Sequence, residues 1–168
     1  MSPTAERQEV INFSDSYYND DSNQYMVVNK NSAYAHATAL NDFAGAKISA
    51  QLGTLQVAYI DQITDVQAIA PMDSYTTLMQ ATATGTIDGY IAEEMVAYEQ
   101  AAANDNLVVV ELINNETGFS VAADEVTVAI GVKKDNTALQ AELNAALATI
   151  SDAEREAMMP EATEMAGE

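Results

Sequence analysis

The sequence contains no cysteine among its 168 residues, which excludes disulfide bonds, thiolate metal sites and cysteine nucleophiles. Basic residues are also scarce: six Lys and Arg stand against 26 Asp and Glu, a formal net charge of -20. Nucleic acid and anionic membrane surfaces are therefore poor partners, because both are bound through Lys and Arg. The acidic residues are scattered along the chain, which indicates a solvated acidic surface.

Signals for membrane insertion and export are absent as well. No apolar run is long enough to span a bilayer. The first residues lack the basic and apolar regions of a secretory signal peptide. We therefore expect that a signal was removed, or that the chain starts downstream of it.

The order of apolar segments predicts the fold class. Apolar residues make up 48% of the chain, enough for the core of one domain. Strand-like segments alternate with helical segments of about ten residues between Lys47 and Leu112, which predicts an α/β fold with a doubly wound, mostly parallel sheet flanked by helices. The predicted strands are 24–30, 47–51, 65–70, 87–92, 106–112 and a long strand 125–134. The predicted helices are 54–63, 73–84, 93–104, 139–150 and a last helix that opens at Ser151. For the helix at 73–84, the predicted N-cap is Asp73 or Ser74 and the predicted C-terminal stop is Gly85.

Two polar features follow strand ends, where open parallel sheets bind ligands. In "QLGTLQ", residues 51–56, Gly53 permits a tight turn and Thr54 lies at the start of the next helix, where backbone N–H groups and a hydroxyl favour an anion such as a carboxylate. The alternative for Thr54 is a plain N-cap. Glu93 ends another strand and can accept from an ammonium group, and its alternative is an acidic first turn that stabilises the helix dipole.

Together, the two features fit a zwitterion, of which a free amino acid is the obvious example. Arg7 would supply a bidentate partner for the same carboxylate if the N-terminal segment folds over this edge. Catalytic signals are weak by comparison: His36 is the only histidine, and no HExxH, nucleophile elbow, Walker A or GxGxxG motif is present. We expect no metal, no cofactor and no enzyme activity.

Several segments resemble one known family along residues 1–159. "MSPTAERQEVINFSDSYY", "LNDFAGAKISAQLGTLQ", "MDSYTTLMQATATGTIDGYIAEEMVAYE", "VTVAIGVKKDNTALQAELNAAL" and "ISDAEREAMM" are similar to successive motifs of the family 3 extracellular solute-binding proteins, the polar amino acid receptors of ABC transporters. The resemblance implies a fold of the periplasmic-binding-protein type II, in which two α/β lobes clamp the ligand. This chain resembles lobe two (26–159) preceded by the end of lobe one and a hinge crossing strand (1–25), with lobe one largely missing and a flexible tail at 160–168.

The resemblance also implies roles for individual residues. Arg7 and Ser2 match positions that hold the ligand α-carboxylate, Glu93 matches the acid that takes the α-ammonium, and the turn of the binding motif matches Gly53, Thr54 and Gln56. The sequence departs from the family pattern at four positions. Glu stands for the usual Asp at 93, and a hydroxyl residue is replaced by Leu55. Pro is replaced by Ser16 and by Met95.

The implied function is the non-catalytic amino acid-binding component of an ABC importer, with the ABC transporter permease as partner. Its location would be extracellular or periplasmic, with a membrane anchor expected in the full-length protein. Two alternatives stay open at this point: a truncated fragment without independent ligand binding, and a cyclic-acid dehydratase of the same fold. An incomplete first lobe would also leave apolar residues of the N-terminal segment unpaired, so we expect self-association through residues 1–25.

Overall fold

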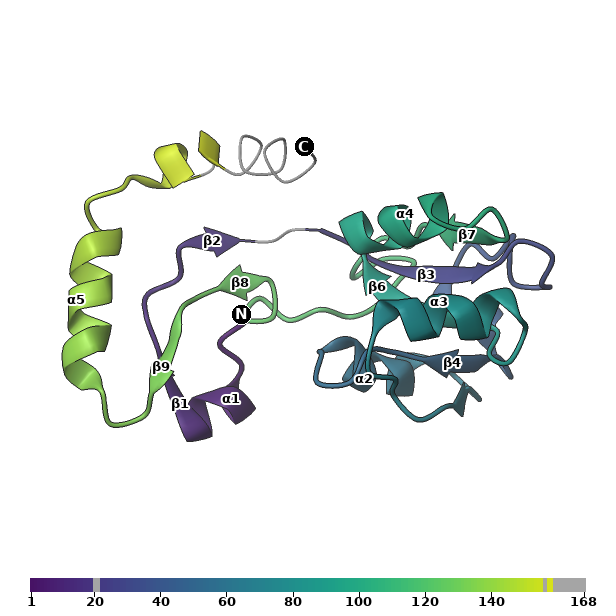
Figure 1. Cartoon of the computed structure of the whole chain (residues 1–168), viewed down its shortest axis with the longest axis horizontal. Helices are drawn as coiled ribbons and strands as arrows, with labels where there is room; N and C mark the ends of the chain where they lie inside the picture. Colours follow the sequence, from purple (N-terminus) through teal and green to yellow (C-terminus); the bar gives the residue numbers. More distant parts are fainter. Residues whose placement is uncertain (20–21, 156, 159–168) are drawn as a thin grey trace. The chain divides into compact units, whose positions relative to one another are not determined.

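A five-stranded sheet dominates the computed structural model, which describes residues 1–19, 22–155 and 157–158 (Figure 1). The sheet belongs to one of two units into which the chain divides. The central unit is Ser22–Val121, and the terminal unit consists of Met1–Asp21 and Ala122–Glu168. The sequence assigns residues 122–159 to lobe two, whereas the structure groups them with the N-terminal residues. The assignment of segments to lobes stays a prediction, and the predicted flexible tail at 160–168 lies outside the described residues.

The sheet of the central unit is mixed, with two parallel and two antiparallel strand pairings. Its strands are β3 (Gln24–Asn29), β4 (Lys47–Ser49), β5 (Gln67–Ala68), β6 (Gly89–Glu93) and β7 (Leu107–Val110), in the spatial order β5-β4-β6-β3-β7. β4 pairs in parallel with β5 and β6, whereas β3 pairs antiparallel with β6 and β7. Four strands therefore run in one direction and β3 runs against them.

Helices cover both faces of this sheet, so the predicted doubly wound α/β class is confirmed. On one face, α3 (Tyr75–Ala83) and α4 (Glu94–Ala102) pack on the cluster that contains Val27. On the other face, η1 (Leu40–Phe43), α2 (Gln56–Tyr59) and η2 (Ile60–Gln62) pack on the cluster that contains Val28. Neighbouring residues of β3 enter opposite clusters because side chains alternate across a strand.

The ends of α3 and α2 test the helix bounds that the sequence predicts. The hydroxyl oxygen of Ser74 accepts from the backbone N–H of Thr77 at 3.2 Å, so Ser74, of the two predicted candidates, is the N-cap of α3. Gly85 follows the helix with a φ of 75°, a conformation that favours glycine. The helix predicted over 54–63 is shorter, because α2 begins only at Gln56 and continues as the 3-10 helix η2.

The terminal unit contains two short antiparallel ribbons. Its elements are α1 (Ala5–Val10), β1 (Ile11–Phe13), β2 (Tyr18–Asn19), β8 (Thr127–Val128), β9 (Gly131–Lys133) and α5 (Thr137–Leu147). β1 pairs with β9, and β2 pairs with β8. The sequence did not predict α1, which is six residues long and whose N-cap, Thr4, makes no side-chain capping hydrogen bond. The last predicted helix is supported by a capping box: Ser151 N–H donates to the Glu154 carboxylate at 2.9 Å, and Glu154 N–H donates to the Ser151 hydroxyl oxygen at 3.3 Å.

The prediction of one long strand over 125–134 is wrong, because different partners bind its middle and its ends. Ala129 N–H donates to the carbonyl of Met1 at 3.0 Å, and the Met1 ammonium donates to the carbonyl of Ala129 at 3.1 Å. The next N–H, of Ile130, donates to the hydroxyl oxygen of Ser14 at 3.0 Å. The segment is therefore divided into β8 and β9, and neither strand belongs to the five-stranded sheet.

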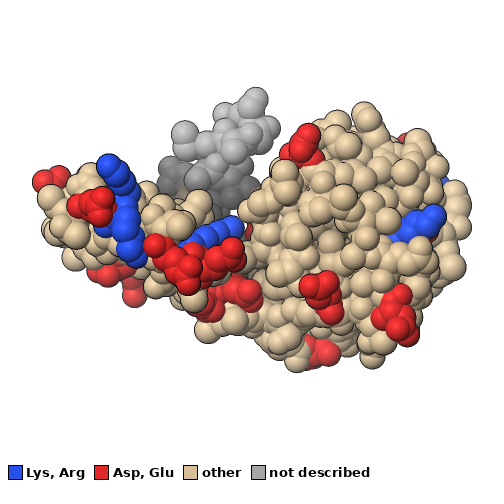
Figure 2. Space-filling model, turned by 90° about the horizontal axis from the view of Figure 1, so that it is seen from below, with Lys and Arg blue, Asp and Glu red and all other residues tan. Residues whose placement is uncertain are grey.

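Acidic side chains are dispersed on one face of the central unit. Figure 2 shows Asp and Glu side chains on the face of the central unit that it presents, separated by uncharged surface. This arrangement keeps like charges apart and favours solvation of each carboxylate. Among the described residues, no helix combines the length and the apolar character needed to cross a membrane.

One core residue gives a direct test of this packing. Tyr90 of β6 is fully buried, and its hydroxyl has no hydrogen-bond partner among the described residues. A buried unsatisfied hydroxyl is destabilising, so Tyr90→Phe should raise the free energy of unfolding by about 1 kcal/mol. Urea denaturation followed by circular dichroism measures the change.

The matched control for this test is Tyr25→Phe. Tyr25 lies in the same hydrophobic cluster and is almost as buried, but its hydroxyl interacts with the side chains of Asn23 and Glu94. Removing that hydroxyl should lower the free energy of unfolding by about 1 kcal/mol. Equal losses in both variants would contradict the environment described for Tyr90.

Candidate ligand-binding site

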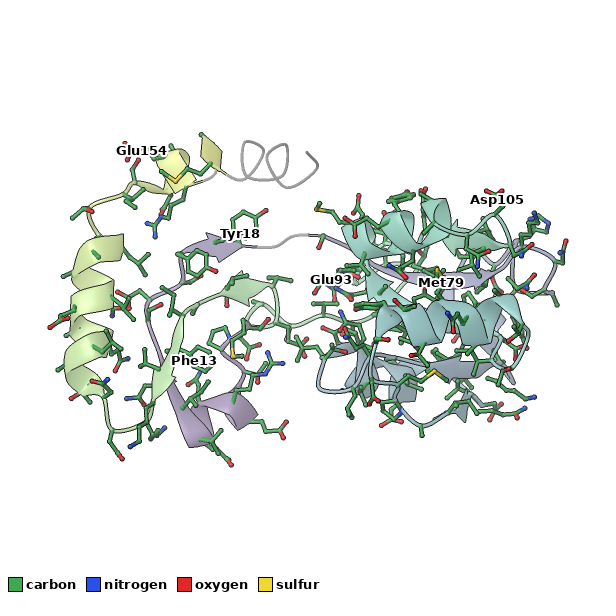
Figure 3. The ribbon with its side chains drawn as sticks, viewed as in Figure 1. Phe13, Tyr18, Met79, Glu93, Asp105 and Glu154 are labelled. Atoms are coloured by element: carbon green, nitrogen blue, oxygen red, sulfur yellow. The ribbon has the colours of Figure 1, made fainter. Side chains whose placement is uncertain are left out.

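Two neighbouring strand ends carry the predicted site residues of the central unit. β4 and β6 are parallel neighbours, with Ser49 paired to Tyr90, so the segments that follow them leave the same edge of the sheet. The turn 51–54 follows β4, and Glu93 is the last residue of β6. Figure 3 shows Glu93 at one end of the central unit and Asp105 at the opposite end. The carboxyl edge of a parallel sheet is where such folds bind ligands.

The turn after β4 is built by a glycine and closed by a hydroxyl. Gly53 has a φ of 80°, which only glycine adopts readily. The turn is joined to the segment after β5, because Leu52 N–H donates to the carbonyl of Met72 at 2.8 Å. The Thr54 hydroxyl donates to the carbonyl of Gln51 at 2.7 Å, and the Thr54 N–H donates to the same carbonyl at 3.3 Å.

Of the two sequence-based interpretations of Thr54, the plain N-cap is wrong. Thr54 lies two residues before α2 and is not its N-cap, which is Leu55. Both donors of Thr54 point to the Gln51 carbonyl, so a ligand carboxylate at this turn would compete with that carbonyl for them. The assignment of Thr54 as a ligand-binding residue stays a prediction.

Gln56 lies inside the unit. Only 4% of the residue is exposed, and its amide nitrogen donates to the amide oxygen of Gln24 at 2.8 Å. Gln24 is itself buried, begins β3 and is the register partner of Glu93. The hydrogen bond between Gln56 and Gln24 therefore connects the segment after β4 with the strand end that carries Glu93.

Glu93 presents an exposed carboxylate at the junction of β6 and α4. It is the N-cap residue of α4 with extended backbone angles, and its side chain does not cap the helix. Tyr75, the first residue of α3, lies within range of its charge: burial, and then the negative charge of Glu93, raise the pKa of Tyr75 to about 12. An exposed carboxylate in this position can accept hydrogen bonds from an ammonium group.

Ser2 and Arg7 belong to the terminal unit and lie together there. The guanidinium of Arg7 donates to the carbonyl of Ser2 at 3.2 Å, and the hydroxyl of Ser2 donates to the carbonyl of Glu125 at 2.8 Å. A guanidinium has five N–H donors, so the bond to Ser2 is compatible with a bidentate pair to a carboxylate. The other four predicted site residues belong to the central unit.

Sequence reasoning missed two residues of this edge, Gln24 and Tyr75. Gln24 stands directly before the apolar run Tyr25–Val28, so a buried polar residue at a strand start was the available signal. Tyr75 follows the N-cap Ser74, but nothing in the sequence shows that α3 starts beside the end of β6. Within the described residues, no three His, Cys, Asp or Glu side chains are grouped as a metal site would require.

The fold and the strand-end site define an α/β lobe of the type II periplasmic-binding-protein class. The chain belongs to the bacterial extracellular solute-binding proteins, family 3, which it matches over residues 1–159. Among curated proteins, it is 31% identical over 152 residues to the ABC transporter arginine-binding protein 1 of Escherichia coli K12, and this match covers 89% of the chain and 58% of the relative. Members of this family are substrate-binding proteins.

Solved structures support the fold. The chain is similar, with a TM-score of 0.74 and 23% identity, to an ancestral arginine-binding protein bound to arginine, covering 96% of this chain and 68% of that one. It is also similar to an amino acid ABC transporter substrate-binding protein of Streptococcus pneumoniae bound to L-arginine, with a TM-score of 0.71 and 22% identity over 98% of this chain and 65% of that one. The chain thus spans about three fifths of the length of the curated relative named above.

Proposed function

We propose that this protein binds a free amino acid as part of the substrate-binding component of an ABC importer. Glu93 would accept from the ligand α-ammonium, and Arg7 with Ser2 and the turn at Thr54 would hold the α-carboxylate. The observation that carries the proposal is the exposed Glu93 carboxylate at the carboxyl end of β6, beside the turn that follows β4. Family membership supports the same role.

The proposed mechanism is binding coupled to domain closure, without catalysis. In a protein with two lobes, a ligand that contacts both lobes stabilises their closed arrangement. The permease of the transporter would then receive the loaded protein, and its location would be extracellular or periplasmic. A charged carboxylate can also act as a general base. In a dehydratase, Glu93 would remove a proton from a carbon of the substrate instead of accepting hydrogen bonds from an ammonium.

Calorimetry with a panel of amino acids tests the proposal. The relatives' names include arginine, so arginine and other cationic amino acids head the panel, followed by glutamine and uncharged residues. For this chain alone we expect weak but saturable binding of at least one α-amino acid, and no binding of analogues that lack the ammonium or the carboxylate. Conversion of a cyclic acid, without amino acid binding, would favour the dehydratase instead.

Arg7 offers a specific test of the carboxylate contact. Arg7→Lys keeps the charge but loses the planar fork that matches a carboxylate, so affinity should fall about tenfold or more. Arg155→Lys is the matched control, because Arg155 is partly exposed like Arg7 but pairs with Asp152, at 2.7 Å within one helical turn. Equal affinities for wild type and Arg7→Lys would remove Arg7 from the proposed site.

A further inference from the structure

The hydrogen bond between Gln24 and Gln56 lies in the interior of the central unit, away from solvent. Both residues are buried, with 7% and 4% exposed, and their amides meet at 2.8 Å. Buried amides without a partner are costly, so each residue depends on the other. A pair of apolar side chains would fill the same space without this dependence, which indicates that orientation matters at this position.

The pair joins the two halves of the proposed site. Gln56 begins α2, two residues after Thr54, and Gln24 begins β3 opposite Glu93. Gln24 is in turn held by its neighbours, since its backbone N–H donates to the side-chain oxygen of Asn114 at 3.1 Å. A displacement of Gln24 would therefore move the first turn of α2 relative to the end of β6.

We infer that Gln24 is a positioning residue, which acts through Gln56 to set the spacing between the turn at Thr54 and the carboxylate of Glu93. The inference rests on the proposed function for its consequence, because that spacing matters for a ligand with a carboxylate and an ammonium on one carbon. It also changes the role expected for Gln56, whose buried side chain orients the turn instead of contacting the ligand. Small misplacements of binding groups are enough to weaken such sites strongly.

The test uses four variants of the full chain: Gln24→Leu, Gln56→Leu, the double variant, and Gln62→Leu as the control. Gln62 lies in the same unit and makes two hydrogen bonds, of 3.0 and 2.7 Å, to the backbone of Ser120, but it is only partly buried. The double variant removes both buried amides and is expected to fold even where a single variant is unstable.

Hydrogen exchange provides a readout that needs no ligand. Exchange of the backbone amides in 52–56 should accelerate about tenfold or more in both single variants, with the amides of α3, which contains neither substituted residue, as the internal reference. If the two residues act as a unit, the double variant should lose no more protection than the worse single variant. Unchanged exchange in Gln24→Leu, or fully additive losses in the double variant, would overturn the inference.

Calorimetry then tests whether the spacing between the turn at Thr54 and Glu93 affects amino acid binding. Amino acid affinity should fall about tenfold or more in Gln24→Leu and in the double variant, and stay unchanged in Gln62→Leu. Altered exchange with unchanged affinity would show a structural role only and overturn the positioning role. If the wild type binds no amino acid, the proposed function fails, and the coupling of Gln24 to the turn is decided by hydrogen exchange alone.

Discussion

Glu93→Gln is expected to lower amino acid affinity about 30- to 150-fold, because removing one partner of a charge pair costs about 2–3 kcal/mol. The substitution keeps the shape of the side chain and removes the charge that an ammonium requires. Calorimetry with the best ligand of the panel measures the loss. Glu93→Asp, which keeps the charge on a shorter side chain, should recover part of the affinity.

Glu99→Gln is the matched control for this substitution. Glu99 lies on α4, the helix that follows Glu93, and is exposed like Glu93, but it is not at the strand end. Its replacement changes the net charge by the same amount and should leave affinity unchanged. A similar loss in both variants would assign the effect to the overall charge of the protein and would contradict a specific ammonium contact.

The Tyr75 phenol reports on the same substitution without any ligand. Burial, followed by the charge of Glu93, raises the pKa of Tyr75 to about 12. Because Glu93→Gln removes the second cause only, the pKa should move down toward the ordinary value of 10 without reaching it. NMR titration of the Tyr75 ring measures the shift, and an unchanged pKa would show that the two side chains do not interact.

Phe43→Ala should produce the largest loss of stability, about 3–5 kcal/mol, because it leaves a cavity in a closed core. Phe43 is fully buried at the end of η1 and stacks on Tyr34, with ring centroids 5.7 Å apart. Domains of this size are stable by about 5–15 kcal/mol, so the variant should unfold at a much lower urea concentration. Circular dichroism follows the transition.

Met95→Ala is the control for the core substitution. Met95 lies in the same unit and is also a large apolar residue, but 57% of it is exposed. Truncating an exposed side chain removes few contacts. The free energy of unfolding of Met95→Ala should therefore differ from that of the wild type by less than about 0.5 kcal/mol. A small loss in Phe43→Ala, close to that of the control, would contradict the closed packing of this face of the sheet.

Local signals predicted the central unit well. Alternating apolar segments indicated the strands and helices, and Ser74 and Gly85 indicated the bounds of α3. These signals succeed because capping and glycine conformation depend on a few neighbouring residues. The same logic failed at 125–134, where the backbone of Ala129 pairs with Met1, more than a hundred residues away.

The sequence predicted which chemical groups lie at the candidate site, but it did not predict their hydrogen-bond partners. Glu93 and Thr54 were both expected at strand ends, and in the structure Glu93 ends β6 and Thr54 lies in the turn after β4. The structure shows in addition that the donors of Thr54 are directed to Gln51 and that the amide of Gln56 is directed to Gln24. Such hydrogen bonds depend on distances between strands that no sequence spacing records.

By itself, the sequence determined the α/β class, the family and the types of residue available to bind a zwitterion, because these follow from periodicity, composition and motifs. Only the tertiary structure decided the register that sets Gln24 opposite Glu93 and the direction of β3 against its neighbours. It also decided that Gln56 is buried. The physical reason is that backbone pairing and burial arise from contacts between segments distant in the chain, and each contact selects one of several arrangements that local preferences allow.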